Sequence, residues 1–282
     1  MALMKLAEAI EQHVRDGQSV ALEGFTHLIP FAAGHEIVRQ GRRDLHLIRM
    51  TPDLIYDQMI GMGCASQLTF SWGGNPGVGS LHRLRDAVEK QWPHPLAIVE
   101  RSHAEMAVAY QAGASGLPCG LMRSYVDTDL ARLPGAHVEE IACPFSGDSL
   151  TAVPAINPDV TILHAQQTDA EGNVLIRGIV GAMKEAALAA RCLIVTVEEQ
   201  VERLHADMNA IVLPRWLVTA VCIVPGGAYP SYAQGYYPRD NRFYLAWDGI
   251  ARDRQVFRRW MERHVLAMRD HAEFLRALKV AA

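Results

Sequence analysis

A glycine-rich stretch, FSWGGNPGVGS at residues 70–80, is the first candidate for chemistry in this sequence. It follows an apolar run and precedes a segment with helical spacing, so backbone N–H groups at the start of that helix could bind an anion. A nucleoside triphosphate loop requires a lysine directly after its last glycine, and no lysine follows a glycine of this stretch. A dinucleotide fingerprint requires a third glycine where His82 stands. Both nucleotide-binding interpretations are therefore weak.

The same stretch also fits a tight turn between a strand and a helix, in which one or two glycines adopt positive φ. Gly73, Gly74, Gly77 and Gly79 are more glycines than such a turn requires. The surplus indicates a backbone that a ligand or another chain approaches closely. In α/β sheets ligands bind at that place, beyond the carboxyl ends of the strands. The residues by themselves leave the turn and the binding loop open.

Glutamates near the ends of apolar runs form the second group of candidates. They are Glu23, Glu100, Glu198 and Glu199, and Glu105 follows in a segment with helical spacing. Carboxylates at such positions are candidate substrate-facing groups, but each fits a helix cap or a salt bridge as well. Glu198 and Glu199 are the better candidates, because adjacent carboxylates repel each other unless other groups hold them. A catalytic role for these two or for Glu105 stays open.

No self-sufficient catalytic motif accompanies these carboxylates. The sequence lacks the G-x-S-x-G elbow of serine hydrolases, an H-E-x-x-H motif and a Cys-x-x-Cys pair. We therefore predict no metal site and interpret His35, His82, His103 and His164 as hydrogen-bonded structural residues. The five cysteines are scattered, which indicates buried thiols of a reducing cytosol. The chain shows a site-like surface without an obvious reactive group.

Charge and hydropathy narrow the class of partner. The formal net charge is -4 and no basic block stands out, which argues against nucleic acid. Residues 1–17 have the pattern of an amphipathic helix with acidic residues, unlike a signal or transit peptide. Because no uncharged run approaches the length of a membrane span, we expect no membrane association. The predicted location is cytoplasmic.

Apolar runs and helical patterns alternate through most of the chain. Runs typical of buried strands lie at 19–25, 45–50, 66–72, 95–100, 159–166, 191–199 and 210–214. Helical patterns lie at 32–40, 52–63, 80–92, 103–114 and 183–190. Strands that alternate with helices and are apolar on both faces indicate a parallel sheet covered on both sides. We predict an α/β fold with a mostly parallel, open sheet in a single domain, 1–282.

Three segments depart from this rhythm. Residues from about 120 to 157 are rich in Pro, Gly, Ser and Asp, and we interpret them as an irregular excursion within the domain. Residues 224–247 hold five tyrosines, and an aromatic loop of that length usually covers something. From about 249 to 280, apolar residues at helical spacing with charges between them predict surface helices.

Several stretches together resemble the alpha chains, or A subunits, of family I coenzyme A transferases. The segment DGQSVALEGFTHLIPFAAGHEIVRQG is similar to their N-terminal signature, although Glu23 stands where the signature has a first glycine. The similarity continues through SWGGNPGVGSLHRLRDAVEKQWP, HAEMAVAYQAGASGLP, NPDVTILHAQQTDAEGNVLI, KEAALAARCLIVTVEEQV and VPGGAYPSYAQGYY, to about Asp248. Within the family the sequence looks most similar to the A subunits of 3-oxoadipate CoA-transferases of the β-ketoadipate pathway of aromatic degradation.

The resemblance implies the CoA-transferase fold, of the NagB/RpiA type, and a function. It implies transfer of CoA from succinyl-CoA to 3-oxoadipate, in a ping-pong reaction through a glutamyl-CoA thioester. In this family the nucleophilic glutamate lies in a Ser-Glu-Asn-Gly-like motif of the beta subunit, and no such motif occurs here. The resemblance therefore implies no catalytic residue in this chain, activity only with a beta subunit in an α2β2 heterotetramer, and CoA as a substrate moiety without a permanently bound cofactor.

The resemblance also implies which residues face the acyl-CoA and dicarboxylic acid substrates. The predicted substrate-binding residues are Gly24, Phe25, Gly73, Gly74, Asn75, Gly77 and Arg83. Asn75 would bond a carboxylate or carbonyl of the substrate, and Arg83 or Arg85 would neutralise a distal carboxylate. Both arginines fit a solvated helix face equally well.

Three other functions remain at this point. One is the A subunit of a glutaconate-type CoA-transferase. Another is a hydrolase of the same fold that opens a cyclic CoA ester, whose relatives place a working glutamate near the region of Glu105. The third is a metabolite-sensing module without enzymatic activity, since related folds serve regulators.

Overall fold

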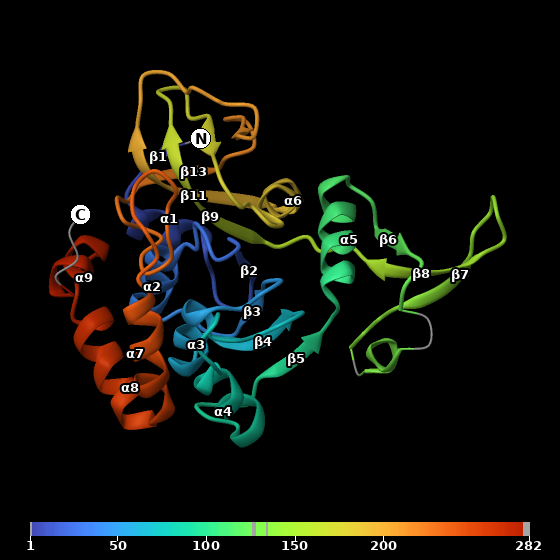
Figure 1. Ribbon diagram of the computed structural model, residues 1–282, viewed down its shortest axis with the longest axis horizontal. Helices are drawn as coiled ribbons and strands as arrows, with labels where there is room; N and C mark the ends of the chain where they lie inside the picture. Colours follow the sequence, from blue (N-terminus) through green and yellow to red (C-terminus); the bar gives the residue numbers. More distant parts are fainter. Residues whose placement is uncertain (1, 126–127, 134, 279–282) are drawn as a thin grey trace.

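A mostly parallel sheet of ten strands forms the centre of the computed structural model, which describes residues 2–125, 128–133 and 135–278 (Figure 1). Its strands are β1 (Ala2–Leu3), β2 (Ser19–Leu22), β3 (Leu45–Ile48), β4 (Ala65–Phe70), β5 (Ala97–Glu100), β9 (Val160–Thr168), β10 (Val174–Ile176), β11 (Cys192–Gln200), β12 (Ile211–Leu213) and β13 (Ala220–Ile223). The order β1-β13-β11-β9-β2-β3-β4-β5 is parallel throughout, and β10 pairs antiparallel with β9 and β12. The predicted α/β class with a mostly parallel open sheet is confirmed.

Helices cover both faces of this sheet, as expected for strands that are apolar on both sides. They are α1 (Leu6–His13), α2 (Phe31–Arg39), α3 (Leu54–Gly61), α4 (His82–Lys90), α5 (His103–Ala114), α6 (Met183–Ala189), α7 (Asn241–Arg252), α8 (Arg254–Met261) and α9 (His271–Ala277), with a π-helical turn at Glu262–Leu266. Helices α1 to α4, α7 and α8 share one apolar core, and α5 and α6 share another. None of the helices in the described part of the chain has the length and apolar character needed to cross a membrane.

The excursion predicted as irregular forms a small antiparallel sheet of its own. Its strands are β6 (Cys119–Met122), β7 (Glu139–Ala142) and β8 (Ser149–Pro154), in the order β6-β8-β7, and a 3-10 turn lies at Asp129–Arg132. Figure 1 shows this sheet beyond α5, projecting from the body. Side chains of β6 and β8 pack on α5, while the Pro and Gly residues that made the composition look irregular occupy mainly turns and strand ends. Residues 126–127 and 134 lie outside the described residues.

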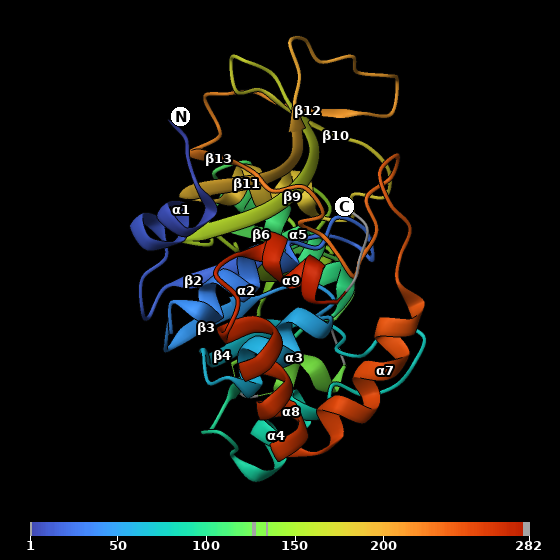
Figure 2. The same cartoon turned by 90° about the vertical axis from the view of Figure 1, so that its left-hand side faces the viewer.

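The C-terminal helices begin earlier than the sequence pattern indicated. Helix α7 starts at Asn241, inside the stretch 224–247 whose composition predicted an aromatic loop, and the Asp240 side chain accepts a hydrogen bond from Phe243 N at 3.0 Å. Figure 2 shows α8 and α9 in front of α2 and α3. Phe257 and Phe274 are fully buried, so these surface helices close part of the core. Positions 279 and 280 of the predicted range lie outside the described residues.

Candidate functional site

The carboxyl ends of the parallel strands bring distant segments together at one edge of the sheet. The segments that follow β2, β3 and β4 start at Glu23, Arg49 and Ser71. Strands β9 and β11 extend beyond the end of β2 and carry His164 and Glu198. Residues 224–240, which we call the aromatic segment, follow β13 at the same edge. This edge therefore holds most of the residues that the sequence singled out.

The loop after β2 forms the wall of an open pocket. Gly24 has φ 155°, and a Cβ there would lie 2.7 Å from the carbonyl oxygen of His27, so a side chain would strain this position. Phe25 is 37% exposed and lines a cavity of about 440 Å³ together with Met50, Gln111 and Ile179. The structure thus places the Phe25 ring at an accessible surface, whereas Gly24 beside it is buried, and contact of either residue with substrate stays a prediction.

A buried polar cluster lies directly beneath this loop. The Glu23 carboxylate accepts a hydrogen bond from the Tyr110 hydroxyl at 2.9 Å, and Arg49 Nη2 donates to the carbonyl oxygen of Gly24 at 2.6 Å. Burial raises the pKa of Glu23, and the charge of Arg49 and the hydrogen bonds offset only part of that rise. Glu23 faces the core, and Arg49, which the sequence analysis did not single out, lies between it and the loop.

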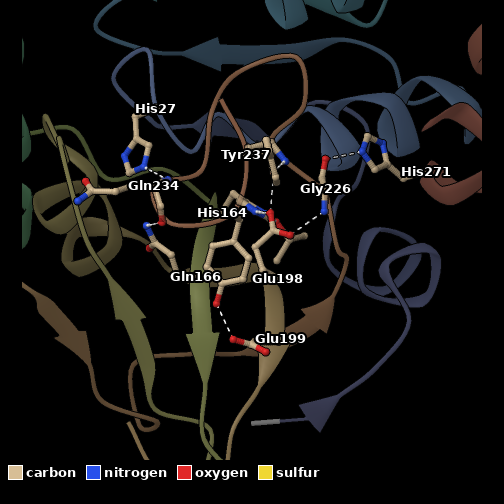
Figure 3. Close-up of polar contacts among 12 residues, drawn as sticks. His27, His164, Gln166, Glu198, Glu199, Gly226, Gln234, Tyr237 and His271 are labelled. Atoms are coloured by element: carbon tan, nitrogen blue, oxygen red, sulfur yellow. Dashed lines mark hydrogen bonds and ion pairs between the residues drawn. The ribbon is translucent and has the colours of Figure 1, made fainter. Parts of the chain in front are cut away.

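A second buried cluster centres on Glu198 (Figure 3). Its Oε1 lies 2.6 Å from His164 Nε2 and accepts a hydrogen bond from the Tyr237 hydroxyl at 2.6 Å, and its Oε2 accepts one from Gly226 N at 2.7 Å. Burial by itself raises the pKa of Glu198, but the partners His164, Tyr237 and Gly226 outweigh burial and lower it. Glu198 therefore stays ionised. Its hydrogen bonds connect strands β9 and β11 to Gly226 and Tyr237, the two ends of the loop 226–237.

The aromatic segment lies over the loop after β2. Leu28 N donates to the Tyr232 carbonyl at 2.9 Å, and the Ser231 hydroxyl donates to the Thr26 carbonyl at 2.9 Å. His27 Nε2 accepts from Gln234 N at 3.0 Å (Figure 3). The aromatic composition predicted a covering loop, and what it covers is the segment that carries Gly24 and Phe25.

A larger cavity of about 800 Å³ opens between the aromatic segment and α9. Glu198 and Glu199 contribute to its wall with several aromatic and apolar side chains, among them Tyr229, Tyr236, Tyr237 and Leu275. Glu199 is exposed, and its Oε1 accepts hydrogen bonds from Tyr236 at 2.6 Å and from Gln167 at 2.9 Å. These two bonds lower its pKa. The two adjacent glutamates thus differ: one is enclosed and the other reaches solvent.

The glycine-rich stretch folds as a turn closed on itself and packed against α7. Asn75 and Gly79 exchange backbone hydrogen bonds of 2.9 and 3.1 Å, and Gly77 has φ 79°. The Asn75 side chain is buried and donates to the Tyr244 carbonyl at 2.8 Å. A Cβ at Gly74 would lie 2.5 Å from the indole ring of Trp72. These contacts explain the glycines as elements of a compact turn, and ligand binding by Gly73, Gly74, Asn75 and Gly77 stays a prediction.

Arg83 lies inside the protein rather than on a solvated helix face. Its guanidinium pairs with Asp86 at 3.1 Å, donates to the Arg252 carbonyl at 3.2 Å and lies over the ring of Trp92. These contacts favour a structural role in which Arg83 joins α4 to the C-terminal helices. Arg85 is exposed and pairs with Glu89 at 2.9 Å. Neither arginine shares the pocket wall of Phe25, so their binding roles remain untested predictions.

The remaining carboxylates are separated from these clusters. Glu100 ends the edge strand β5 and is exposed, whereas Glu105 in α5 is fully buried, 3.2 Å from Arg101. Burial raises the pKa of Glu105. Within residues 2–125, 128–133 and 135–278, no group of three or more His, Cys, Asp or Glu side chains could hold a metal ion.

Comparison with known proteins identifies the family. Residues 3–223 match the family model described as Coenzyme A transferase. This chain belongs to the coenzyme A transferase family. The resemblance seen in the sequence is thereby confirmed, and CoA is a substrate of this family.

Relatives within this family cover nearly the whole chain. The A subunit of 3-oxoadipate CoA-transferase from Pseudomonas knackmussii is 61% identical over 272 residues, 96% of each chain. The A subunit of glutaconate CoA-transferase from Acidaminococcus fermentans is 31% identical over 98% of this chain and 91% of its own. The crystal structure of glutaconate coenzyme A-transferase from the same organism superimposes with a TM-score of 0.90 at 29% identity, over 99% of this chain and 93% of that one.

Proposed function

We propose that this chain is the A subunit of a CoA-transferase that moves CoA from succinyl-CoA to 3-oxoadipate. The observation that carries the proposal is the 61% identity, over 96% of both chains, to the A subunit of a 3-oxoadipate CoA-transferase. The chain offers no Ser-Glu-Asn-Gly-like motif of its own. The proposal therefore includes a B subunit that supplies the nucleophilic glutamate, in an α2β2 assembly located in the cytoplasm.

The proposed chemistry proceeds by ping-pong. The partner's glutamate carboxylate attacks the thioester carbonyl of succinyl-CoA, the CoA thiolate leaves, and a mixed anhydride forms. The thiolate then attacks the glutamyl carbonyl, which releases succinate and leaves a glutamyl-CoA thioester. 3-Oxoadipate takes CoA by the reverse steps. Each addition passes through an oxyanion, which backbone N–H groups can stabilise, and water must be excluded because it would hydrolyse the anhydride.

In this proposal the chain supplies one wall of a pocket that the partner closes. Gly24 and Phe25 line the acyl group, and the turn from Gly73 to Gly77 borders it. Support for the first part comes from the exposed Phe25 ring at the 440 Å³ cavity. The turn from Gly73 to Gly77 has less structural support as a pocket border, because the Asn75 side chain already donates a hydrogen bond to the Tyr244 carbonyl.

Co-expression with the candidate B subunit tests this function. The purified complex is expected to exchange CoA between succinyl-CoA and 3-oxoadipate, and neither of the two chains is expected to do so by itself. Measured across a panel of dicarboxylic acids, a preference for glutaconate would support the second candidate, which the TM-score of 0.90 to glutaconate coenzyme A-transferase favours. Carbon–carbon cleavage without CoA exchange, or full activity of this chain by itself, would contradict the proposal.

A further inference from the structure

Arg49 is a fully buried cation directly behind the pocket wall. It follows β3 and has 0% exposure, and among the described residues its side chain donates one hydrogen bond, from Nη2 to the Gly24 carbonyl oxygen at 2.6 Å. Among the described residues, its Nε and Nη1 have no hydrogen-bond partner. A buried guanidinium with free donors is unfavourable unless other interactions compensate it. Its position beneath the loop therefore needs a physical explanation.

The charge of Arg49 is balanced by acidic groups that it does not directly bond. Glu23 and Asp53 are both buried; burial raises the pKa of each, and Arg49 offsets part of the rise. The ring of Tyr56 lies 5.5 Å from the guanidinium carbon and adds a cation–π contact. The electrostatic surroundings thus hold the cation in place, while its single directed bond goes to the Gly24 carbonyl.

The hydrogen bond from Arg49 also fixes the orientation of the peptide between Gly24 and Phe25, at the pocket wall. The peptide between Gly24 and Phe25 is planar and trans, so the Phe25 N–H points opposite to the Gly24 carbonyl. Arg49 holds the carbonyl toward the core, which directs the N–H toward the exposed side of the loop. No acceptor for the Phe25 N–H occurs in the described part of the chain. A free backbone donor thus accompanies the ring that lines the cavity.

We propose that Arg49 is a positioning residue, which fixes the Gly24–Phe25 peptide so that the Phe25 N–H meets the oxyanion formed during acyl transfer. This inference rests on the proposed function and deepens it. A donor oriented before the reaction needs no reorganisation when the negative charge develops, which is why such donors contribute strongly to rate. Gly24 contributes the backbone conformation, φ 155°, that brings this peptide against the guanidinium.

The test compares two substitutions in the complex with its B subunit. R49K keeps the charge but not the geometry of the guanidinium, and R49Q removes the charge. We expect kcat to fall about 10-fold in R49K, which keeps the charge, and about 100-fold in R49Q, which is the lower limit of the range known for the loss of an oxyanion donor. KM for succinyl-CoA should change less than about twofold, because the lost interaction belongs to the transition state.

R39K is the matched control. Arg39 in α2 is also an arginine with a largely buried side chain, which is 9% exposed. It pairs with Glu36 at 2.8 Å and does not line the cavity of Phe25. We expect R39K to keep the wild-type kcat. If R49Q does not fold, because Glu23 and Asp53 lose their cation, R49K still decides the question.

Three results would overturn the inference. The first is an unchanged kcat in a folded R49K complex, and the second is a rise in KM that accounts for the whole loss. The third is a crystal structure of R49K in which the Gly24–Phe25 peptide keeps its orientation, and this readout holds whether or not the complex transfers CoA. Absence of CoA exchange in the wild-type complex would instead contradict the proposed function.

Discussion

Glu23 and Glu198 are two buried glutamates at the same edge of the sheet, yet their pKa values shift in opposite directions. They are 3% and 6% exposed, so burial penalises the charge of both. Glu198 receives short bonds from His164, Tyr237 and Gly226. Glu23 receives one bond from Tyr110 and a longer one, 3.4 Å, from Met50 N. Direct hydrogen bonds, more than burial, therefore decide whether such a carboxylate stays ionised.

The two clusters also support different parts of the site. The Glu198 cluster joins strands β9 and β11 to the aromatic segment, which covers the loop after β2. The Glu23 cluster supports the same loop from below, through Arg49. In the Glu198 cluster, short hydrogen bonds surround an ionised carboxylate. In the Glu23 cluster, charged groups with fewer direct bonds lie beneath the pocket wall. The following substitutions separate these roles.

The largest effect is expected from E198L. It leaves His164, the Tyr237 hydroxyl and Gly226 N without their shared acceptor, and each buried group left without its hydrogen-bond partner typically costs about 1–3 kcal/mol, so we expect a total loss of about 3–5 kcal/mol. Urea unfolding of the full chain measures the free energy of unfolding. A loss below about 1 kcal/mol would show that the cluster does not hold the aromatic segment.

A pair of tyrosine substitutions should show a smaller difference between the clusters. Y237F removes a 2.6 Å bond to an ionised carboxylate and should cost about 2 kcal/mol, whereas Y110F removes a 2.9 Å bond to Glu23 and should cost about 1 kcal/mol. Equal losses in urea unfolding, or a larger loss for Y110F, would contradict the assignment of the stronger carboxylate site to Glu198.

The pH dependence of E198Q and E23Q should have opposite signs. The folded-state pKa of Glu198 lies below its ordinary value of 4.5, so its ionisation stabilises the fold above that pH, and the stability is lost as the pH falls. The folded-state pKa of Glu23 lies above 4.5, so its ionisation opposes folding as the pH rises. Relative to wild type, E198Q should therefore become less stable, and E23Q more stable, as the pH rises from about 4 to about 7. Unfolding curves whose differences move in the same direction would refute this.

The smallest effect is expected from E199Q. Glu199 adjoins Glu198 in the chain, but it is exposed. Substitutions at such surface positions usually change stability by less than about 0.5 kcal/mol. E199Q therefore serves as the control for E198L, and a comparable loss in urea unfolding would mean that the two glutamates act as one unit.

The fold was accessible from the sequence because its signals are local. Alternating apolar runs and helical patterns placed most strands and helices, and buried parallel strands need no partner to be recognised. The short strands of the excursion were missed, and so were β1, β10 and β13. In the excursion, turn residues dominate the composition although β8 packs its Val153 into the core. The glycine-rich stretch was identified as unusual, and its tight turn was one of the two interpretations.

The sequence by itself determined the class of fold, the family and the absence of a Ser-Glu-Asn-Gly-like motif, because these depend on local periodicity and on motifs. Only the tertiary structure decided the environment of each side chain. It buried Arg83 beneath the C-terminal helices, joined Asn75 to Tyr244 across 169 positions, and placed Arg49 against Gly24 across 25. Such contacts follow from how helices and strands pack, and a carboxylate or guanidinium acquires its hydrogen bonds and its pKa only when that packing is complete.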